Sequence, residues 1–281
     1  MKPAPLVFRR VRTVDEAIAL IAAHDGYAKF LAGGQTLGPM MNLRLAQPDL
    51  VVDISRLDEL LGVTERNDSL LVGAATPHAG FEDGIVPDAA NGLLRRVAAG
   101  IAYRAVRNRG TLGGSLAHAD PSAEWPTVMT ALGATVHVRG AQGRRSIAIE
   151  QFVRGAMTTA LADDELIEAV EIPRLSRAAR WGFYKRCRKV GEFAQSLSAV
   201  VLNRDRGFHR VVMGATGGAP RCLERTSRML AEIHMWKDGC EREIRAAYEA
   251  DMNAIGLTFD EYDRHVHGLA VIRAAREALS S

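Results

Sequence analysis

Apolar and polar positions alternate over the first 55 residues in a way that predicts a small β–turn–helix–β unit. Residues 13–16 read Thr-Val-Asp-Glu, a capping box that predicts a helix with an apolar face at every third or fourth position. Apolar segments at residues 29–31 and 50–54 have the length and composition of strands. Between them, Pro39 can open a short helix that extends to Leu45. We therefore expect two strands joined through a glycine turn and a short helix.

The rest of the chain predicts a mixed fold in two further parts. In order, we expect two strands within residues 63–74, helices over 91–102 and 121–132, a hairpin within 136–149, a strand over 166–172, three β-rich segments within 181–216, and helices from 224 to 280. A short basic stretch at residues 174–180 separates two regions of different character. The pattern predicts an α+β protein with a domain boundary near residue 176, because strands followed by helices indicate a separate unit.

Composition narrows the classes of protein that fit. The chain has 281 residues, 47% of them hydrophobic and 25% charged, with a formal charge of +3, which suits about two domains at roughly 150 residues each. Its three cysteines are far apart and form no C-x-x-C pair, which argues against disulfides, zinc and iron–sulfur ligation in this chain. No apolar run reaches the roughly 18 residues of a membrane helix, and the N-terminus lacks a signal peptide. Basic residues are dispersed, so we expect a cytoplasmic protein with no membrane span and no nucleic-acid partner.

Two double-glycine turns are the main candidates for a binding site. Gly33-Gly34 and Gly113-Gly114 each follow an apolar stretch and precede hydroxyl or amide side chains. Glycine lets backbone N–H groups face inward, so each turn could surround an anion. Position 35 is glutamine where a G-x-G-x-x-G motif needs glycine, and no P-loop lysine follows, so a diphosphate suits the pair better than a transferable phosphate. Double glycines also occur where a chain merely reverses direction, and the residues alone leave both interpretations open.

Other polar residues allow two interpretations each. Glu124 opens an expected helix, where a carboxylate either compensates the helix dipole or accepts from ribose hydroxyls. The arginines at 104, 107 and 109 could neutralise phosphate or form a salt-bridged surface. Asp120 could cap a helix, and we interpret His118 as a packing histidine. No G-x-S-x-G motif is present, although the residues alone leave a Ser-His-Asp triad open, and the spacing of cysteines and histidines predicts no metal site.

Several of these segments together resemble one known family. Residues 32–36 read AGGQT, followed by MNLRL at 41–45 and VVDI at 51–54, and residues 107–121 read RNRGTLGGSLAHADP. In this order they resemble the FAD-binding medium subunits of molybdenum hydroxylases, the family of carbon monoxide dehydrogenase and xanthine dehydrogenase. The likeness continues through residues 158–161, 165–173 and 184–194 and covers nearly the whole chain. Thr36 and Glu192 replace a common serine and a common aspartate, which leaves their contacts open.

The resemblance implies a fold and a set of cofactor contacts. It implies a two-part FAD-binding domain of the PCMH type, similar to vanillyl-alcohol oxidase-like flavoproteins, over residues 1–176, with parts of about 1–55 and 56–176. A smaller domain of antiparallel sheet plus helices would occupy residues 177–281. The diphosphate would lie between the two glycine turns. The residues implied to bind FAD are Lys29, Phe30, Leu31, Ala32, Gly33, Gly34, Gln35, Thr36, Ile101, Thr111, Leu112, Gly113, Gly114, Ser115, Glu124, Leu161 and Lys185.

The resemblance also implies an electron-transfer subunit. Its FAD would accept electrons from two [2Fe–2S] clusters on a small subunit and pass them to an external acceptor, while a large subunit with a molybdenum cofactor hydroxylates the substrate. Two alternatives are a free-standing FAD-dependent oxidoreductase acting on a small molecule and a non-enzymatic adaptor that has lost its cofactor. The glycines retained at 33, 34, 113 and 114 disfavour the adaptor. By the same resemblance, the hydroxylated substrate would be selected on another subunit, and the external acceptor would bind at the flavin face.

Overall fold

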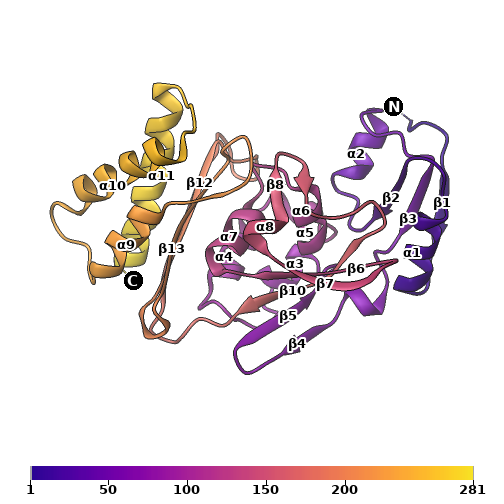
Figure 1. Cartoon of the computed structure of the whole chain (residues 1–281), viewed down its shortest axis with the longest axis horizontal. Helices are drawn as coiled ribbons and strands as arrows, with labels where there is room; N and C mark the ends of the chain where they lie inside the picture. The colour runs from indigo at the N-terminus through magenta and orange to yellow at the C-terminus, as the bar shows by residue number, and fades with distance from the viewer. Residues whose placement is uncertain (1, 281) are drawn as a thin grey trace.

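The structure, a computed structural model, describes residues 2–280. Three parts follow one another along the long axis in chain order (Figure 1). A small sheet with α1 and α2 lies at one end, a five-stranded sheet with several helices occupies the middle, and a four-stranded sheet with three helices forms the other end. The α+β class expected from the sequence is confirmed.

The first part is a three-stranded parallel sheet in the order β1-β3-β2. Its elements are β1 (Val7–Arg10), α1 (Val14–Ala22), β2 (Ala28–Leu31), α2 (Leu37–Asn42) and β3 (Leu50–Asp53). The predicted β–turn–helix–β unit is present, but α2 ends three residues before Leu45. The pattern did not reveal β1, because all four of its residues are exposed and carry no apolar alternation. The apolar face of α1 packs on β3 and β2 and forms the core of this part.

Helix α1 begins at the expected cap. Thr13 Oγ1 accepts from the N–H of Glu16 at 3.1 Å, while the Glu16 carboxylate accepts from the N–H of Arg12 at 2.8 Å. The capping box predicts that Glu16 accepts from the N–H of the cap residue, Thr13. In the structure it accepts instead from the N–H of Arg12, one residue earlier.

Replacing Thr13 by alanine is expected to lower the free energy of unfolding by about 1 kcal/mol, because the Glu16 N–H loses its acceptor. Denaturant titration measures the effect as a lower midpoint with an unchanged slope. Thr13→Ser keeps the hydroxyl and should retain most of the stability. Equal losses in the two variants would contradict the assignment of the cap.

The middle part is a five-stranded antiparallel sheet in the order β4-β5-β10-β6-β7. Its elements are a 3-10 helix η1 (Asp58–Leu60), β4 (Val63–Glu65), β5 (Ser69–Gly73), α3 (His78–Glu82), α4 (Leu93–Ala99), α5 (Arg104–Arg107), α6 (Leu112–His118), α7 (Glu124–Leu132), β6 (Thr135–Gly140), β7 (Gly143–Ala148), α8 (Ile149–Phe152), β8 (Val153–Gly155), β9 (Thr158–Thr159) and β10 (Leu166–Pro173). The helices lie on one face of the sheet (Figure 1), where buried residues of the strands and helices form the largest core cluster.

The third part is an antiparallel sheet in the order β11-β12-β13-β14. Its elements are β11 (Arg180–Arg186), β12 (Ser196–Asn203), a 3-10 helix η2 (Arg204–Arg206), β13 (Phe208–Gly214), β14 (Arg221–Cys222), α9 (Glu224–Glu232), α10 (Cys240–Ile255) and α11 (Glu261–Ser280). One face of this sheet packs on α9 to α11. The other face, including Phe183 and Val201, joins the core of the middle part through α7. The predicted boundary near residue 176 therefore lies between units that share a core, and it stays a prediction.

Two features are absent from residues 2–280, the part of the chain that the structure describes. No helix there is both long and apolar enough to span a membrane. In the same range, no group of three or more His, Cys, Asp or Glu side chains is arranged to hold a metal ion.

Candidate functional site

The first glycine segment presents a row of unpaired backbone donors. Strand β2 ends at Leu31, and the chain turns through Gly34, whose φ of 73° is in the left-handed region that favours glycine. The N–H groups of residues 33–36 donate to no acceptor in the described part of the chain, although the Gly34 carbonyl accepts from Gly38 N–H at 3.0 Å. Gly33 is buried, whereas Gln35 and Thr36 are exposed. Consecutive unpaired amides of this kind can bind an anionic group.

The second double glycine is not a bare turn, and that prediction is wrong. Thr111 caps helix α6, and its Oγ1 accepts from Gly114 N–H at 3.0 Å. The amide of Gly113 donates to the Ala74 carbonyl at 2.8 Å, and the Leu112 amide is also paired with the segment after β5. The glycines are needed for close packing instead, because a Cβ at position 113 would lie 2.5 Å from Ala74 Cβ. Whether residues 111–115 contact FAD through their side chains stays a prediction.

The two glycine segments do come together. A Cβ on Gly33 would overlap the carbonyl oxygen of Arg109 and lie 2.9 Å from Gly110 Cα. On the other side of the contact, a Cβ on Gly114 would lie 3.8 Å from Ala32 Cβ. Backbone contact between the segments therefore requires glycine at position 33, and the two segments form one continuous surface.

The other residues implied in the first segment have different surroundings. Phe30 and Ala32 pack against the core beneath α1, so the Phe30 side chain supports the loop from behind. Lys29 is exposed and lies over the ring of Tyr27 at 5.2 Å from its centroid. Leu31 lies under the turn, since a Cβ on Gly34 would be 3.3 Å from its Cδ1. The contacts of these residues with FAD stay predictions.

Glu124 and Lys185 form a buried ion pair that joins α7 to β11. Lys185 Nζ lies 2.6 Å from Glu124 Oε1, and the two side chains are 10% and 9% exposed. Lys185 also donates to the Gly100 carbonyl at 3.4 Å. Burial raises the pKa of Glu124, and the charge of Lys185 opposes this shift. Glu124 does open a helix, as expected, but its partner is a lysine 61 residues away, and a ribose contact stays a prediction.

The same lysine brings the segment at Ile101 into the site. Ile101 directly follows Gly100 and is buried in the main core, with Leu161 packed against the same cluster. Ala102, the next residue, has a φ of 41°, which is strained for a residue with a Cβ. Ile101 and Leu161 thus belong to one core, and Lys185 reaches the segment at Ile101 through the Gly100 carbonyl. The contacts of Ile101, Leu161 and Lys185 with the flavin ring stay predictions.

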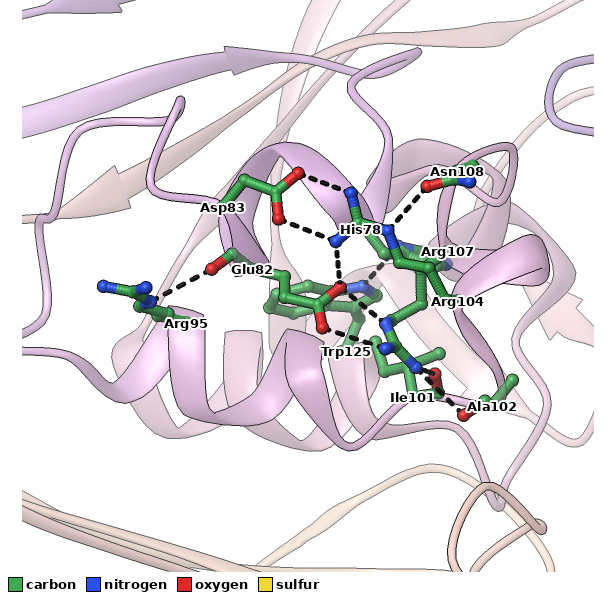
Figure 2. A network of polar contacts seen from close by, with 10 residues as sticks. All are labelled: His78, Glu82, Asp83, Arg95, Ile101, Ala102, Arg104, Arg107, Asn108 and Trp125. Carbon is green, nitrogen blue, oxygen red and sulfur yellow. Dashed lines mark hydrogen bonds and ion pairs between the residues drawn. The ribbon is translucent and has the colours of Figure 1, made fainter.

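A network of polar contacts holds α5 against α3 (Figure 2). Arg107 contacts the two carboxylate oxygens of Glu82 at 2.7 and 2.9 Å and donates to the carbonyls of Ile101 and Ala102 at 2.9 and 3.0 Å. Arg104 pairs with Glu82 and Asp83. The salt-bridged interpretation therefore applies to these two arginines, and Arg107 fixes the strained segment beside Lys185.

Three further polar residues of this region, Arg109, Asp120 and His118, have different surroundings. Arg109 is exposed and forms no ion pair within residues 2–280. Asp120 caps the following turn, accepting from Ser122 N–H at 2.8 Å. His118 is half-buried, and burial lowers its pKa, which fits a packing histidine.

The sequence did not reveal His78, which accepts a hydrogen bond from Trp125, because a lone histidine at the start of a five-residue helix has no recognisable pattern.

A separate hollow of about 420 Å³ lies on the strands of the middle sheet, with Gly73, His137 and Arg144 among its lining residues. None of its lining residues belongs to the glycine segments, and neither Glu124 nor Lys185 is among them. Its arginines already have carboxylate partners, as Arg144 does with Glu168 at 2.8 Å. We therefore locate the candidate site at the glycine segments.

Comparison with known proteins gives consistent results along the chain. A family model described as "FAD binding domain in molybdopterin dehydrogenase" matches residues 5–175. The carbon monoxide dehydrogenase medium chain of Hydrogenophaga pseudoflava is 34% identical over 99% of this chain and 98% of its own length. The nicotine 6-hydroxylase medium subunit of Paenarthrobacter nicotinovorans is 37% identical, with coverages of 97% and 93%. The solved carbon monoxide dehydrogenase from Hydrogenophaga pseudoflava superposes with a TM-score of 0.89 at 30% identity, covering 99% of this chain and 98% of the matched one.

Proposed function

We propose that this chain, which belongs to the family of FAD-binding domains in molybdopterin dehydrogenases, is the FAD-binding medium subunit of a molybdenum hydroxylase. It is an oxidoreductase subunit that accepts electrons from iron–sulfur clusters on a small subunit and passes them to an external acceptor. A large subunit carries the molybdenum cofactor. The observation that carries this proposal is the match to medium subunits over 97–99% of the chain, in both its FAD-binding part and its C-terminal part.

For the cofactor contacts, we propose that the FAD diphosphate lies against the amides of residues 34–36, beside the first turn of α6. The support is the row of unpaired N–H groups and the direct contact between the two segments. The hydroxyls of Thr111 and Ser115 are the groups that α6 can offer, since its first amides already have acceptors. We propose as FAD contacts the residues that the family resemblance implies, with Gly113 and Gly114 serving close packing instead of supplying free amides.

Bound FAD supplies the redox chemistry, and this chain supplies its position and electrostatic surroundings. The Glu124 carboxylate and the Gly100 carbonyl both contact Lys185 Nζ and so fix the position of its ammonium group. Arg107 keeps the neighbouring carbonyls of Ile101 and Ala102 turned inward. Neither residue has to transfer a proton for this role, and we assign no catalytic residue.

The free-standing flavoenzyme is less favoured, because the relatives that match nearly the whole chain are subunits of larger enzymes. An adaptor without cofactor is disfavoured, because the family model described as an FAD-binding domain matches residues 5–175. A cytoplasmic location stays part of the proposal, supported by the three free cysteines.

Affinity purification through a tag on this chain tests the proposed function. We expect two further subunits to co-purify, with flavin and iron–sulfur absorption and with molybdenum found by metal analysis. The purified complex should hydroxylate a substrate that the separated chain does not. A chain that carries FAD, has no partners and turns over a substrate alone would support the free-standing alternative instead, and a complete complex without FAD would contradict the proposal.

A further inference from the structure

His78 lies directly behind the segment that contacts the first glycine loop. It opens α3, and its backbone N–H donates to the Gly110 carbonyl at 2.9 Å. Its ring lies against the same residue, since a Cβ on Gly110 would be 2.8 Å from His78 Nε2 and 3.0 Å from Cδ2. On its other side, Nδ1 accepts from Trp125 Nε1 at 3.0 Å (Figure 2). The histidine is therefore held between a buried indole and the glycine segment.

We propose that His78 is a positioning residue for FAD, whose ring sets the position of residues 109–110 and through them of the cofactor loop at Gly33. This inference rests on the proposed cofactor site.

The path from His78 to the loop contains only backbone. Gly110 has no side chain, so the ring meets its backbone directly. The Arg109 carbonyl and Gly110 Cα in turn meet Gly33, where a Cβ would not fit. Closely packed contacts of this kind transmit displacements, because no flexible side chain lies between the two backbones to absorb them. A change in the size or tilt of the His78 ring should therefore move Gly33 and the unpaired amides that follow it.

Trp125 fixes the ring orientation. The indole N–H is a donor only, so His78 Nδ1 must be unprotonated to accept from it, and the ring proton is assigned to Nε2. Burial, together with the charge of Arg107, lowers the pKa of His78 to about 4, so the neutral ring persists at neutral pH. Trp125 follows Glu124 in α7, and the first turn of that helix thus anchors both the His78 ring and Lys185.

Two substitutions separate this role from an ordinary core histidine. His78→Asn places an amide oxygen near the Nδ1 position, so it can keep the Trp125 hydrogen bond while removing the ring edge at Gly110. In the complex stripped of FAD and titrated with it, we expect the FAD dissociation constant to rise about tenfold or more, equivalent to about 1.4 kcal/mol. Trp125→Phe leaves the His78 ring in place and removes the indole N–H that donates to it. It should lower the melting temperature more than His78→Asn does, and weaken FAD binding less.

A double-mutant cycle with Gly110→Ala gives the decisive readout. In the wild type, the new methyl group meets the His78 ring, and FAD binding should weaken about tenfold, again about 1.4 kcal/mol. In the His78→Asn background the methyl group enters vacated space, so Gly110→Ala should cost little or restore affinity. The Val106 carbonyl, 3.2 Å from the same position, is present in both backgrounds and cancels. The visible circular dichroism of bound flavin should change in parallel with the affinity.

The outcomes distinguish this inference from the cofactor site itself. Additive effects of His78→Asn and Gly110→Ala on FAD affinity, or melting shifts without any change in FAD affinity, would overturn the role of His78. Gly33→Ala tests the site independently of the histidine. If Gly33→Ala releases FAD and His78→Asn does not, only the positioning role fails. If neither releases FAD, the proposed diphosphate site at residues 34–36 is wrong as well.

Discussion

Replacing Lys185 by methionine is expected to lower the free energy of unfolding by about 3–5 kcal/mol, because it leaves the Glu124 carboxylate buried without a partner. The pair is almost inaccessible, so solvent screening does little to reduce the effect. Denaturant titration of the variant and the wild type measures the difference. The double variant Glu124→Gln/Lys185→Met removes both charges and should recover a large part of the loss. An unchanged stability in Lys185→Met would contradict the burial of the pair.

The free energy of unfolding lost in Lys185→Met should become smaller as the pH falls. Burial raises the folded-state pKa of Glu124 above its unfolded value, and removal of Lys185 raises it further. A carboxyl group with a raised folded pKa destabilises the fold when ionised, so the penalty is complete above that pKa. The penalty disappears as pH falls to the unfolded pKa. The stability gap between Lys185→Met and wild type should therefore narrow towards acid, whereas the double variant should show no such narrowing.

Replacing Gly33 by alanine is expected to cause the largest loss of cofactor. The new Cβ would overlap the Arg109 carbonyl, and backbone on both sides of the contact leaves no flexible atom to yield. The two segments must separate, and we expect the FAD dissociation constant to rise by roughly 100-fold, which is about 2.7 kcal/mol of binding. Flavin content per chain and fluorescence titration with FAD both measure this loss.

Gly38→Ala is the matched control, since nothing lies within 4 Å of a Cβ at that position in α2. Alanine favours helix over glycine by up to about 1 kcal/mol, so this variant should keep its flavin and gain slightly in stability. Loss of FAD from Gly38→Ala equal to that from Gly33→Ala would show that the whole segment is sensitive to any side chain, and the packing argument would fail.

Local signals in the sequence were enough for part of the fold. Thr13 predicted the start of α1, and the polar turn between two apolar segments within residues 63–74 predicted β4 and β5. The segments at residues 32–36 and 107–121 identified the family because their residue order is specific. Strand β1 was missed because a parallel partner 43 residues later stabilises it, and an exposed four-residue strand leaves no alternation to detect.

The site was harder to predict, because its chemistry depends on contacts between distant residues. Gly113-Gly114 was interpreted as a turn, since glycine disfavours helix, yet the Thr111 cap and contact with Ala74 stabilise the first turn of α6 there. Glu124 and Lys185 were both singled out, but their pairing across 61 residues could not be inferred from spacing. His78 gave no signal at all, because its meaning comes from Gly110 and Trp125 on other elements.

A crystal structure of the complex with FAD bound tests the central claim most directly. The account predicts that the diphosphate oxygens lie within hydrogen-bonding distance of the backbone N–H groups of residues 34–36, with α6 beside them and Lys185 near the flavin ring. A diphosphate held elsewhere, for example in the arginine-lined hollow of the middle sheet, with residues 34–36 in contact only with solvent, would contradict it.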